Sequence, residues 1–153
     1  MVRDRNAQTA KLHLILGNMR SGKTSSLIRR LQRYRSIGHD VFYLSSLKDI
    51  RCGDNEIMTH DGMSVTAHKT LHLTKNSKKG VFNQNPPTIP YHTTVIGIDE
   101  CQFFDDLKEF VDEKLKEGFI IVLAGLDGDY QQKSFSNNIL EFIPMADSYK
   151  KLY

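Results

Sequence analysis

Residues 17–24 read Gly17-Asn18-Met19-Arg20-Ser21-Gly22-Lys23-Thr24 and stand between an apolar run, Leu12–Leu16, and a segment with helical spacing. The pattern G-x-x-x-x-G-K-[ST] in a strand–loop–helix context is the phosphate-binding P-loop. Its glycines let the backbone wrap around an anion, so that successive N–H groups point at phosphate oxygens. We expect Lys23 to reach the terminal phosphates and the Thr24 hydroxyl to ligate Mg²⁺. The octapeptide therefore predicts a nucleoside triphosphate site, with a glycine-rich turn without ligand as the alternative.

The composition places the chain among single-domain globular proteins. It has 153 residues, 39% of them hydrophobic and 25% charged, which suits one domain with a sizeable core. A net charge of +3 is too small to indicate nucleic acid binding. No apolar run approaches the roughly 18 residues that cross a bilayer, so no membrane association is expected. Cys52 and Cys101 are isolated, which indicates a reduced, cytoplasmic compartment.

Strand and helix signals alternate along the chain. Apolar runs predict strands at Leu12–Leu16, Asp40–Ser46, Thr94–Asp99, Phe119–Ala124 and Ser148–Tyr153. Apolar residues at helical spacing predict helices at Lys23–Arg35 and Phe103–Glu117. Alternation of this kind implies βαβ units with right-handed crossovers. The expected fold class is α/β, a P-loop NTPase-type parallel sheet flanked by helices.

The remaining segments are less regular. Residues 1–11 are expected to form a disordered lead-in, and residues 12–153 the single P-loop kinase α/β domain. Residues 64–73 alternate loosely between apolar and polar, which fits either an added strand or a poor helix. Residues 74–93 are polar and proline-rich, which predicts a surface loop or, alternatively, a lid over the nucleotide.

Two carboxylates, Asp99 and Glu100, follow the apolar run that begins at Val95. In P-loop enzymes an aspartate at the end of a strand holds Mg²⁺ beside the P-loop hydroxyl, which predicts Asp99 and Thr24 as the metal pair. Strand alternation would turn Glu100 the other way, where it would act as a general base on water or on an acceptor hydroxyl. Capping of the next helix by the two acids is the alternative.

Three segments together carry a family resemblance: Gly17–Thr24, the IDECQFF segment Ile98–Phe104 and the AGLDGDYQ segment Ala124–Gln131. In order and spacing they resemble the type II thymidine kinase family, which includes cellular and poxviral enzymes. The similarity runs from about Leu12 to Leu152, although residues 63–93 match poorly. The second and third segments are far more specific than the P-loop.

The resemblance implies ATP-dependent phosphorylation of the 5′-hydroxyl of thymidine. It gives Glu100 the role of catalytic base, and it adds Lys23 and Arg51 to the phosphate-transfer machinery. It also implies nucleotide contacts from Asp49, Arg51, Asp99 and Gln102. Four residues are implied at the nucleoside, namely Met19, Phe104, Leu126 and Tyr130. A solvated loop position for Arg51, and core positions for Met19, Phe104 and Leu126, are the alternatives.

The pattern departs from the family at its end. The family's four-cysteine zinc site and its lasso loop, which hydrogen-bonds the thymine base, lie beyond the position of Tyr153, so no zinc is expected in this chain. Base specificity is therefore the weakest inference. The resemblance also implies a homo-oligomer, a tetramer or a dimer. An NTP-hydrolysing P-loop module and a non-catalytic homologue remain the alternative functions.

Overall fold

The computed structural model describes residues 10–18, 21–46, 56–58, 64–66, 68–70, 73–74, 87–126 and 139–153. Strands and helices follow one another in the order β1 (Lys11–Gly17), α1 (Lys23–Ser36), β2 (Val41–Ser46), β3 (Glu56–Met58), β4 (Ser64–Thr66), β5 (His68–Thr70), β6 (Val95–Ile98), the 3₁₀ helix η2 (Cys101–Phe103), α2 (Leu107–Lys116), β7 (Ile120–Leu126), the 3₁₀ helix η3 (Ile139–Met145) and β8 (Ser148–Leu152).

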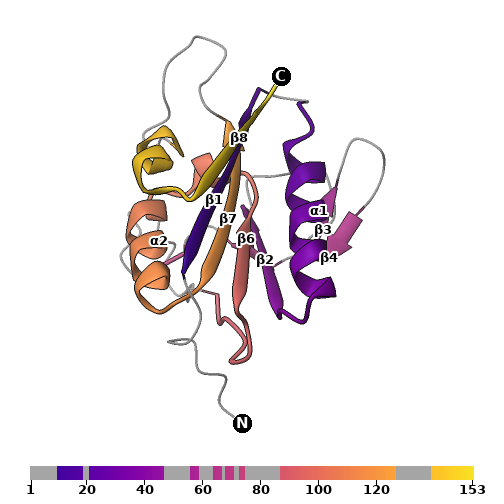
Figure 1. Cartoon of the computed structure of the whole chain (residues 1–153), viewed down its shortest axis with the longest axis vertical. Helices are drawn as coiled ribbons and strands as arrows, with labels where there is room; N and C mark the ends of the chain where they lie inside the picture. Colours follow the sequence, from indigo (N-terminus) through magenta and orange to yellow (C-terminus); the bar gives the residue numbers. More distant parts are fainter. Residues whose placement is uncertain are drawn as a thin grey trace.

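Six strands form one parallel sheet in the order β5-β2-β6-β7-β1-β8. Helix α1 covers one face of this sheet, and α2 with η3 covers the other (Figure 1). Strands β3 and β4 form a separate antiparallel hairpin. The predicted α/β class, a parallel sheet flanked by helices, is confirmed.

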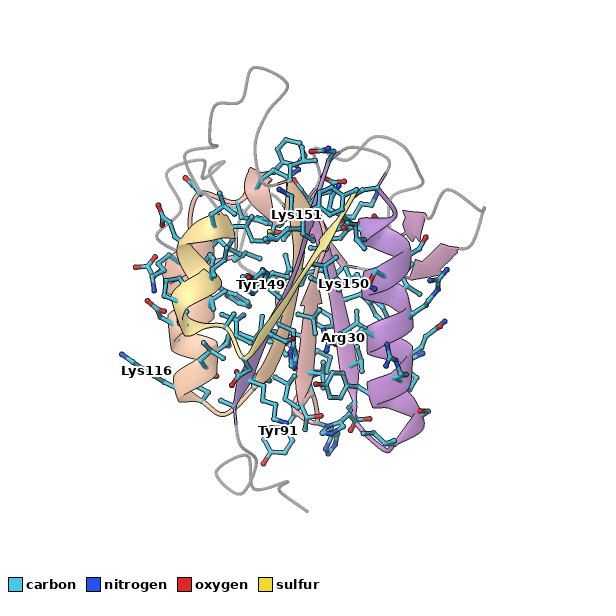
Figure 2. All side chains as sticks on the ribbon, turned by 45° about the horizontal axis from the view of Figure 1, so that its top comes forward. Arg30, Tyr91, Lys116, Tyr149, Lys150 and Lys151 are labelled. Atoms are coloured by element: carbon cyan, nitrogen blue, oxygen red, sulfur yellow. The ribbon has the colours of Figure 1, made fainter. Side chains whose placement is uncertain are left out.

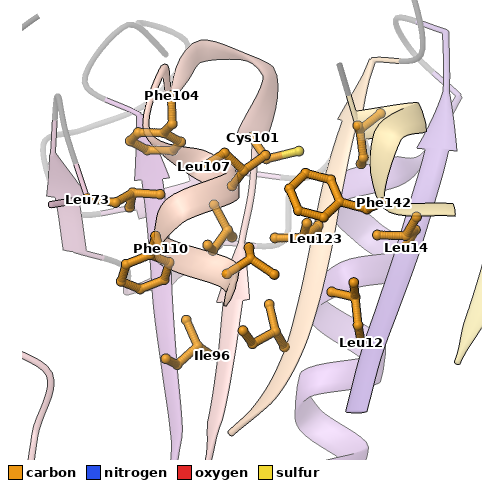
Figure 3. Packing of buried hydrophobic residues seen from close by; sticks show 14 of the residues in the cluster. Leu12, Leu14, Leu73, Ile96, Cys101, Phe104, Leu107, Phe110, Leu123 and Phe142 are labelled. Carbon is orange, nitrogen blue, oxygen red and sulfur yellow. The ribbon is translucent and has the colours of Figure 1, made fainter. Parts of the chain in front are cut away.

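Strand alternation in β1 feeds both cores. Leu12, Leu14 and Leu16 pack on the α2 side, whereas Ile15 packs against α1. Figure 3 shows the larger cluster, in which Phe104, Phe110 and Phe142 come together from the segment before α2, from α2 and from η3. Burial of both faces explains why the central strands are continuous apolar runs rather than alternating ones.

The element boundaries correct the prediction in three places. The strand predicted at Thr94–Asp99 ends at Ile98, and the helix predicted from Phe103 begins only at Leu107. Residues 64–66 and 68–70 are strands, so the helical alternative for residues 64–73 was wrong. Residues 1–9 and 75–86 lie outside the described residues, which leaves the disordered lead-in and the lid as predictions.

The side chain of Asp106, the residue before α2, links the helix to the segment after β5. Its Oδ2 accepts hydrogen bonds from the backbone N–H groups of Leu73, at 2.8 Å, and Thr74, at 2.6 Å. The carboxylate therefore fixes the segment after β5 against the start of α2. Sequence patterning does not register such a contact, because it joins residues more than thirty positions apart.

Strand β8 forms one edge of the sheet and pairs with β1. Its Tyr149, Lys150 and Lys151 lie at the molecular surface (Figure 2). Lysines on an edge strand disfavour uncontrolled pairing with a second sheet. The polar character of β8 thus fits its position at the edge.

Helix α1 packs directly on the backbone of β6 at Gly97. A β-carbon at this position would overlap Leu31 Cδ1 and lie 2.9 Å from Leu31 Cδ2, and Leu31 is fully buried. We expect Gly97→Ala to lower the free energy of unfolding by roughly 1–3 kcal/mol, because overpacking forces side-chain and backbone shifts. Urea denaturation measures this change. Gln32→Ala, on the exposed side of the same helix, should stay within about 0.5 kcal/mol of the parent; an equal effect of both variants would contradict the close packing.

His13 joins β1, β8 and α1 far from the P-loop end of the sheet. Its Nδ1 lies 2.6 Å from Ser148 Oγ and its Nε2 lies 3.0 Å from the Tyr34 hydroxyl. Burial lowers the pKa of His13 below 6.5, with Arg30 acting in the same direction and Asp147 against it. The imidazole is therefore held neutral inside the folded protein.

This lowered pKa predicts a pH-dependent stability. Below about pH 6.5 the unfolded chain takes up a proton at His13 before the folded protein does, so stability is lost as the pH falls toward the lowered folded pKa. We expect His13→Gln to reduce the loss of unfolding free energy between about pH 7.5 and about pH 5.5. Denaturation at the two pH values checks it, with the exposed His92→Gln as control. An identical pH dependence in His13→Gln and the parent would contradict the prediction.

Candidate active site

The segments predicted to form the site meet at the carboxyl ends of the parallel strands. Gly17 at the end of β1 is in register with Leu126 of β7 and with Leu152 of β8. The Asp99-Glu100 pair directly follows β6, on the other side of β7. The carboxyl ends of the strands are at the top of the molecule in Figure 1. Ligands of open α/β sheets bind beyond the carboxyl ends of the strands, so these segments occupy the expected place.

The described part of the P-loop is tightly built. Gly22 has φ +88° immediately before α1, a left-handed conformation that favours glycine. A β-carbon at Gly17 would clash with Ser21 Oγ and lie 2.7 Å from the Leu152 carbonyl oxygen. The Ser21 N–H donates to the Asn18 carbonyl oxygen at 3.3 Å. Met19 and Arg20 lie outside the described residues.

Lys23 turns its amine into this loop. The residue is only 7% exposed, and its Nζ donates to the Asn18 carbonyl oxygen and, at 3.5 Å, to Ser21 Oγ. The cation therefore lies against the loop at the N-terminus of α1. Both the helix dipole and the lysine favour an anion at this position.

Thr24, at the start of α1, contacts Asp99, which follows β6, although β7 lies between β1 and β6 in the sheet. Thr24 Oγ1 donates to Asp99 Oδ2 at 2.9 Å, and Asp99 is 1% exposed. Both are hard oxygen ligands, as Mg²⁺ prefers, and adjacent ligands of an octahedral Mg²⁺ lie about 2.9 Å apart. Among the described residues no group of three or more His, Cys, Asp or Glu side chains is placed to hold a metal. Because both of its groups are oxygen ligands, the Thr24–Asp99 pair fits Mg²⁺, with water and phosphate oxygens completing the coordination shell of the metal.

Glu100 has an unusual backbone conformation. Its φ of 52° and ψ of 43° make it the one non-glycine residue with positive φ in the described part of the chain. Strand alternation was predicted to turn the Glu100 side chain away from that of Asp99. This reason is wrong, because β6 ends at Ile98 and a left-handed turn sets the direction of the Glu100 side chain. Left-handed residues other than glycine concentrate at functional sites, where the surrounding structure holds them.

Gln102 is a partner of the Glu100 carboxylate. Its Nε2 donates to Glu100 Oε2 at 2.6 Å, and its Oε1 accepts from the Leu126 N–H at 3.1 Å. The amide is 3% exposed. Gly125 makes room for it, since a β-carbon there would lie 2.9 Å from Gln102 Oε1 and 2.6 Å from Cys101 Sγ. Sequence reasoning gave Gly125 no role of its own, although this glycine lies near the end of an apolar strand and within the Ala124–Gln131 segment that carries the family resemblance.

The other predicted residues divide into two groups. Phe104 is fully buried in the core on the α2 side (Figure 3), and Leu126 is partly exposed at the end of β7. The burial of Phe104 agrees with the alternative prediction that it is a core residue rather than a nucleoside contact. Five predicted residues lie outside the described residues, namely Met19, Arg20, Asp49, Arg51 and Tyr130.

Cys101 is a buried free thiol between these functional residues. Burial, followed by the nearby Asp99 and Glu100 carboxylates, raises the pKa of its thiol well above the usual range. The neutral thiol is a poor nucleophile. Cys101 is therefore not a candidate nucleophile.

The fold and these contacts define an α/β protein with a parallel sheet, in which a glycine-rich loop and a buried lysine follow the first strand. The family model described as thymidine kinase matches residues 10–153. The chain is 40% identical to the thymidine kinase of Rabbit fibroma virus (strain Kasza) over 141 residues, which cover 92% of this chain and 72% of the viral protein. It is 41% identical to thymidine kinase a of Arabidopsis thaliana over 143 residues, covering 92% of this chain and 57% of the plant protein.

The chain belongs to the thymidine kinase family. Membership confirms the predicted resemblance and the enzyme class, and it disfavours a hydrolysing module without a nucleoside substrate. With the Oryza sativa subsp. japonica enzyme, which is 40% identical, the match covers 93% of this chain and 51% of the relative. In the described part of the chain no helix is both long and apolar enough to cross a membrane.

Proposed function

We propose that this protein transfers the γ-phosphoryl group of ATP to the 5′-hydroxyl of thymidine, forming thymidine monophosphate and ADP. The observation that carries the proposal is the convergence of Lys23, the Thr24–Asp99 pair and Glu100 on one edge of the sheet, in a chain of the thymidine kinase family. These groups supply an anion site, a metal site and a base.

The P-loop would hold the triphosphate. Its backbone N–H groups and the N-terminus of α1 favour the β- and γ-phosphates, and the Lys23 amine would exchange the Asn18 carbonyl for phosphate oxygens. Thr24 and Asp99 would hold Mg²⁺, which supplies neutralisation of the charge on the terminal phosphates. Asp49 and Arg51 are proposed to add phosphate contacts, because the planar guanidinium suits the charge of the transferring group.

Glu100 would then remove the proton. As the thymidine 5′-oxygen bonds to the γ-phosphorus, its proton passes to a Glu100 carboxylate oxygen and the bond from phosphorus to the bridging oxygen of ADP breaks. The negative charge that leaves with ADP stays beside Lys23. Positioning and electrostatic stabilisation supply most of the acceleration in this class of reaction.

The nucleoside would lie beyond the end of β7. Leu126 is the described residue at this position, and Met19 and Tyr130 are proposed as further contacts. Apolar walls alone discriminate weakly between bases, so recognition of thymine requires hydrogen bonds to its edge. We further propose that residues 12–153 act as one kinase domain in a cytoplasmic homo-oligomer.

Radiolabelled ATP tests the proposal directly. The protein is incubated with ATP and Mg²⁺, with and without thymidine, and thymidine monophosphate and ADP are separated and counted. The proposed function predicts thymidine monophosphate in amounts equal to thymidine-dependent ADP, abolished by a chelator and restored by Mg²⁺. ADP formation that is independent of thymidine, without any nucleoside monophosphate, would instead support an NTP-hydrolysing module.

A further inference from the structure

Glu100 is held in its left-handed conformation by the structure around it. A residue with a β-carbon is strained in this region relative to the right-handed conformation, so the neighbouring contacts must hold it there. The turn redirects the chain from β6 into η2, which begins at Cys101. As a result Glu100 lies on a turn, where a strand no longer dictates the direction of its carboxylate.

The contacts of Gln102 identify what orients the carboxylate. The Leu126 N–H can only donate, so the amide oxygen of Gln102 must face it, and the amide nitrogen must then face Glu100. This orientation is the observed one, with the 2.6 Å contact at the carboxylate and the 3.1 Å contact at β7. A buried amide that uses both ends in this way has little freedom to turn.

We propose that Gln102 is a positioning residue, which aims the Glu100 carboxylate and ties it to the carboxyl end of β7. The inference rests on the proposed role of Glu100 as the base that receives the hydroxyl proton. Because Leu126 begins the segment proposed to bind the nucleoside, one amide links the base to the place where its substrate arrives. Gln102 then acts through Glu100 and not through the nucleotide.

Gln102→Met is the sharpest variant for this proposal. It keeps the approximate length of the side chain, adds no charge beside Glu100, and removes the donor to Glu100 together with the acceptor for the Leu126 N–H. We expect kcat to fall about tenfold or more, with the ATP dissociation constant unchanged. Gln32→Met, an exposed position on α1, is the matched control and should leave both quantities unchanged.

A double-mutant cycle separates positioning from a general structural role. In the Glu100→Gln background, Gln102→Met should cause no further loss of the residual transfer rate, because the group that it positions is gone. Gln102→Leu repeats the cycle should Gln102→Met fail to fold, and circular dichroism and thermal melting confirm the folded state of each variant.

Three results would overturn the proposal. The first is an equal loss from Gln102→Met in the parent and in the Glu100→Gln background. The second is a weaker ATP affinity with unchanged kcat, which would make Gln102 a nucleotide contact. The third is unchanged kcat together with unchanged ATP affinity. A parent protein that forms no thymidine monophosphate would instead overturn the proposed function, and the same assay distinguishes the two failures.

Discussion

Glu100→Gln is expected to lower kcat for thymidine phosphorylation by about 10²–10⁴-fold, because this is the usual contribution of a general base. The amide has nearly the shape of the carboxylate but cannot accept the hydroxyl proton. ATP binding should survive, since the nucleotide is held by the P-loop and by the Thr24–Asp99 pair. Steady-state transfer rates and equilibrium ATP binding measure the two effects separately.

A matched control tests whether the effect is specific to this position. Glu113 is exposed on α2, on the face of the helix turned away from the core, so Glu113→Gln should leave both kcat and ATP affinity unchanged. Unchanged turnover in Glu100→Gln would reject Glu100 as the base. A loss of ATP affinity equal to the loss of rate would indicate that the residue serves the nucleotide site instead.

Lys23→Ala is expected to produce the second large effect, a fall of about 10²–10³-fold in kcat/KM for ATP. The amine is 7% exposed and lies against the Asn18 carbonyl, inside the loop that would hold the phosphates. Its removal takes away a fixed positive charge where the transferred phosphoryl group gathers negative charge. ATP titrations of the transfer rate, with equilibrium binding alongside, divide the loss between affinity and rate.

The control for Lys23 lies on the opposite side of the molecule. Lys116, labelled in Figure 2, is exposed at the end of α2, so Lys116→Ala removes the same charge from the net total. A similar loss in both variants would show that overall charge, rather than the position of Lys23, governs nucleotide affinity. Normal affinity and rate in Lys23→Ala would contradict the P-loop assignment itself.

The strand–loop–helix unit from Lys11 to Ser36 was predictable because its signals are local. The apolar run, the glycines and the helical spacing lie within one stretch of chain, and each residue's role depends on near neighbours. The same holds for the central strands, whose apolar runs suffice to bury both faces of the sheet. Strand β5 was ambiguous, because three residues at the edge of a sheet carry almost no periodicity.

The geometry around Glu100 was not predictable in this way. Strand alternation was the predicted reason for the direction of the Glu100 carboxylate, but Glu100 lies on a left-handed turn after β6, and its carboxylate accepts a hydrogen bond from Gln102. The bond from Leu126 to Gln102 joins residues 24 positions apart. No local propensity encodes a hydrogen bond over that separation.

By itself, the sequence determined a parallel α/β domain with the P-loop sequence pattern and with two adjacent carboxylates after an apolar strand, because these features depend on residue type and short spacing. Tertiary structure alone decided that β7 lies between β1 and β6, that Thr24 reaches Asp99 across it, and that Gln102 holds Glu100 toward the end of β7. The physical reason is that a hydrogen bond within 3 Å requires the full strand order, the twist of the sheet and the packed core beneath it.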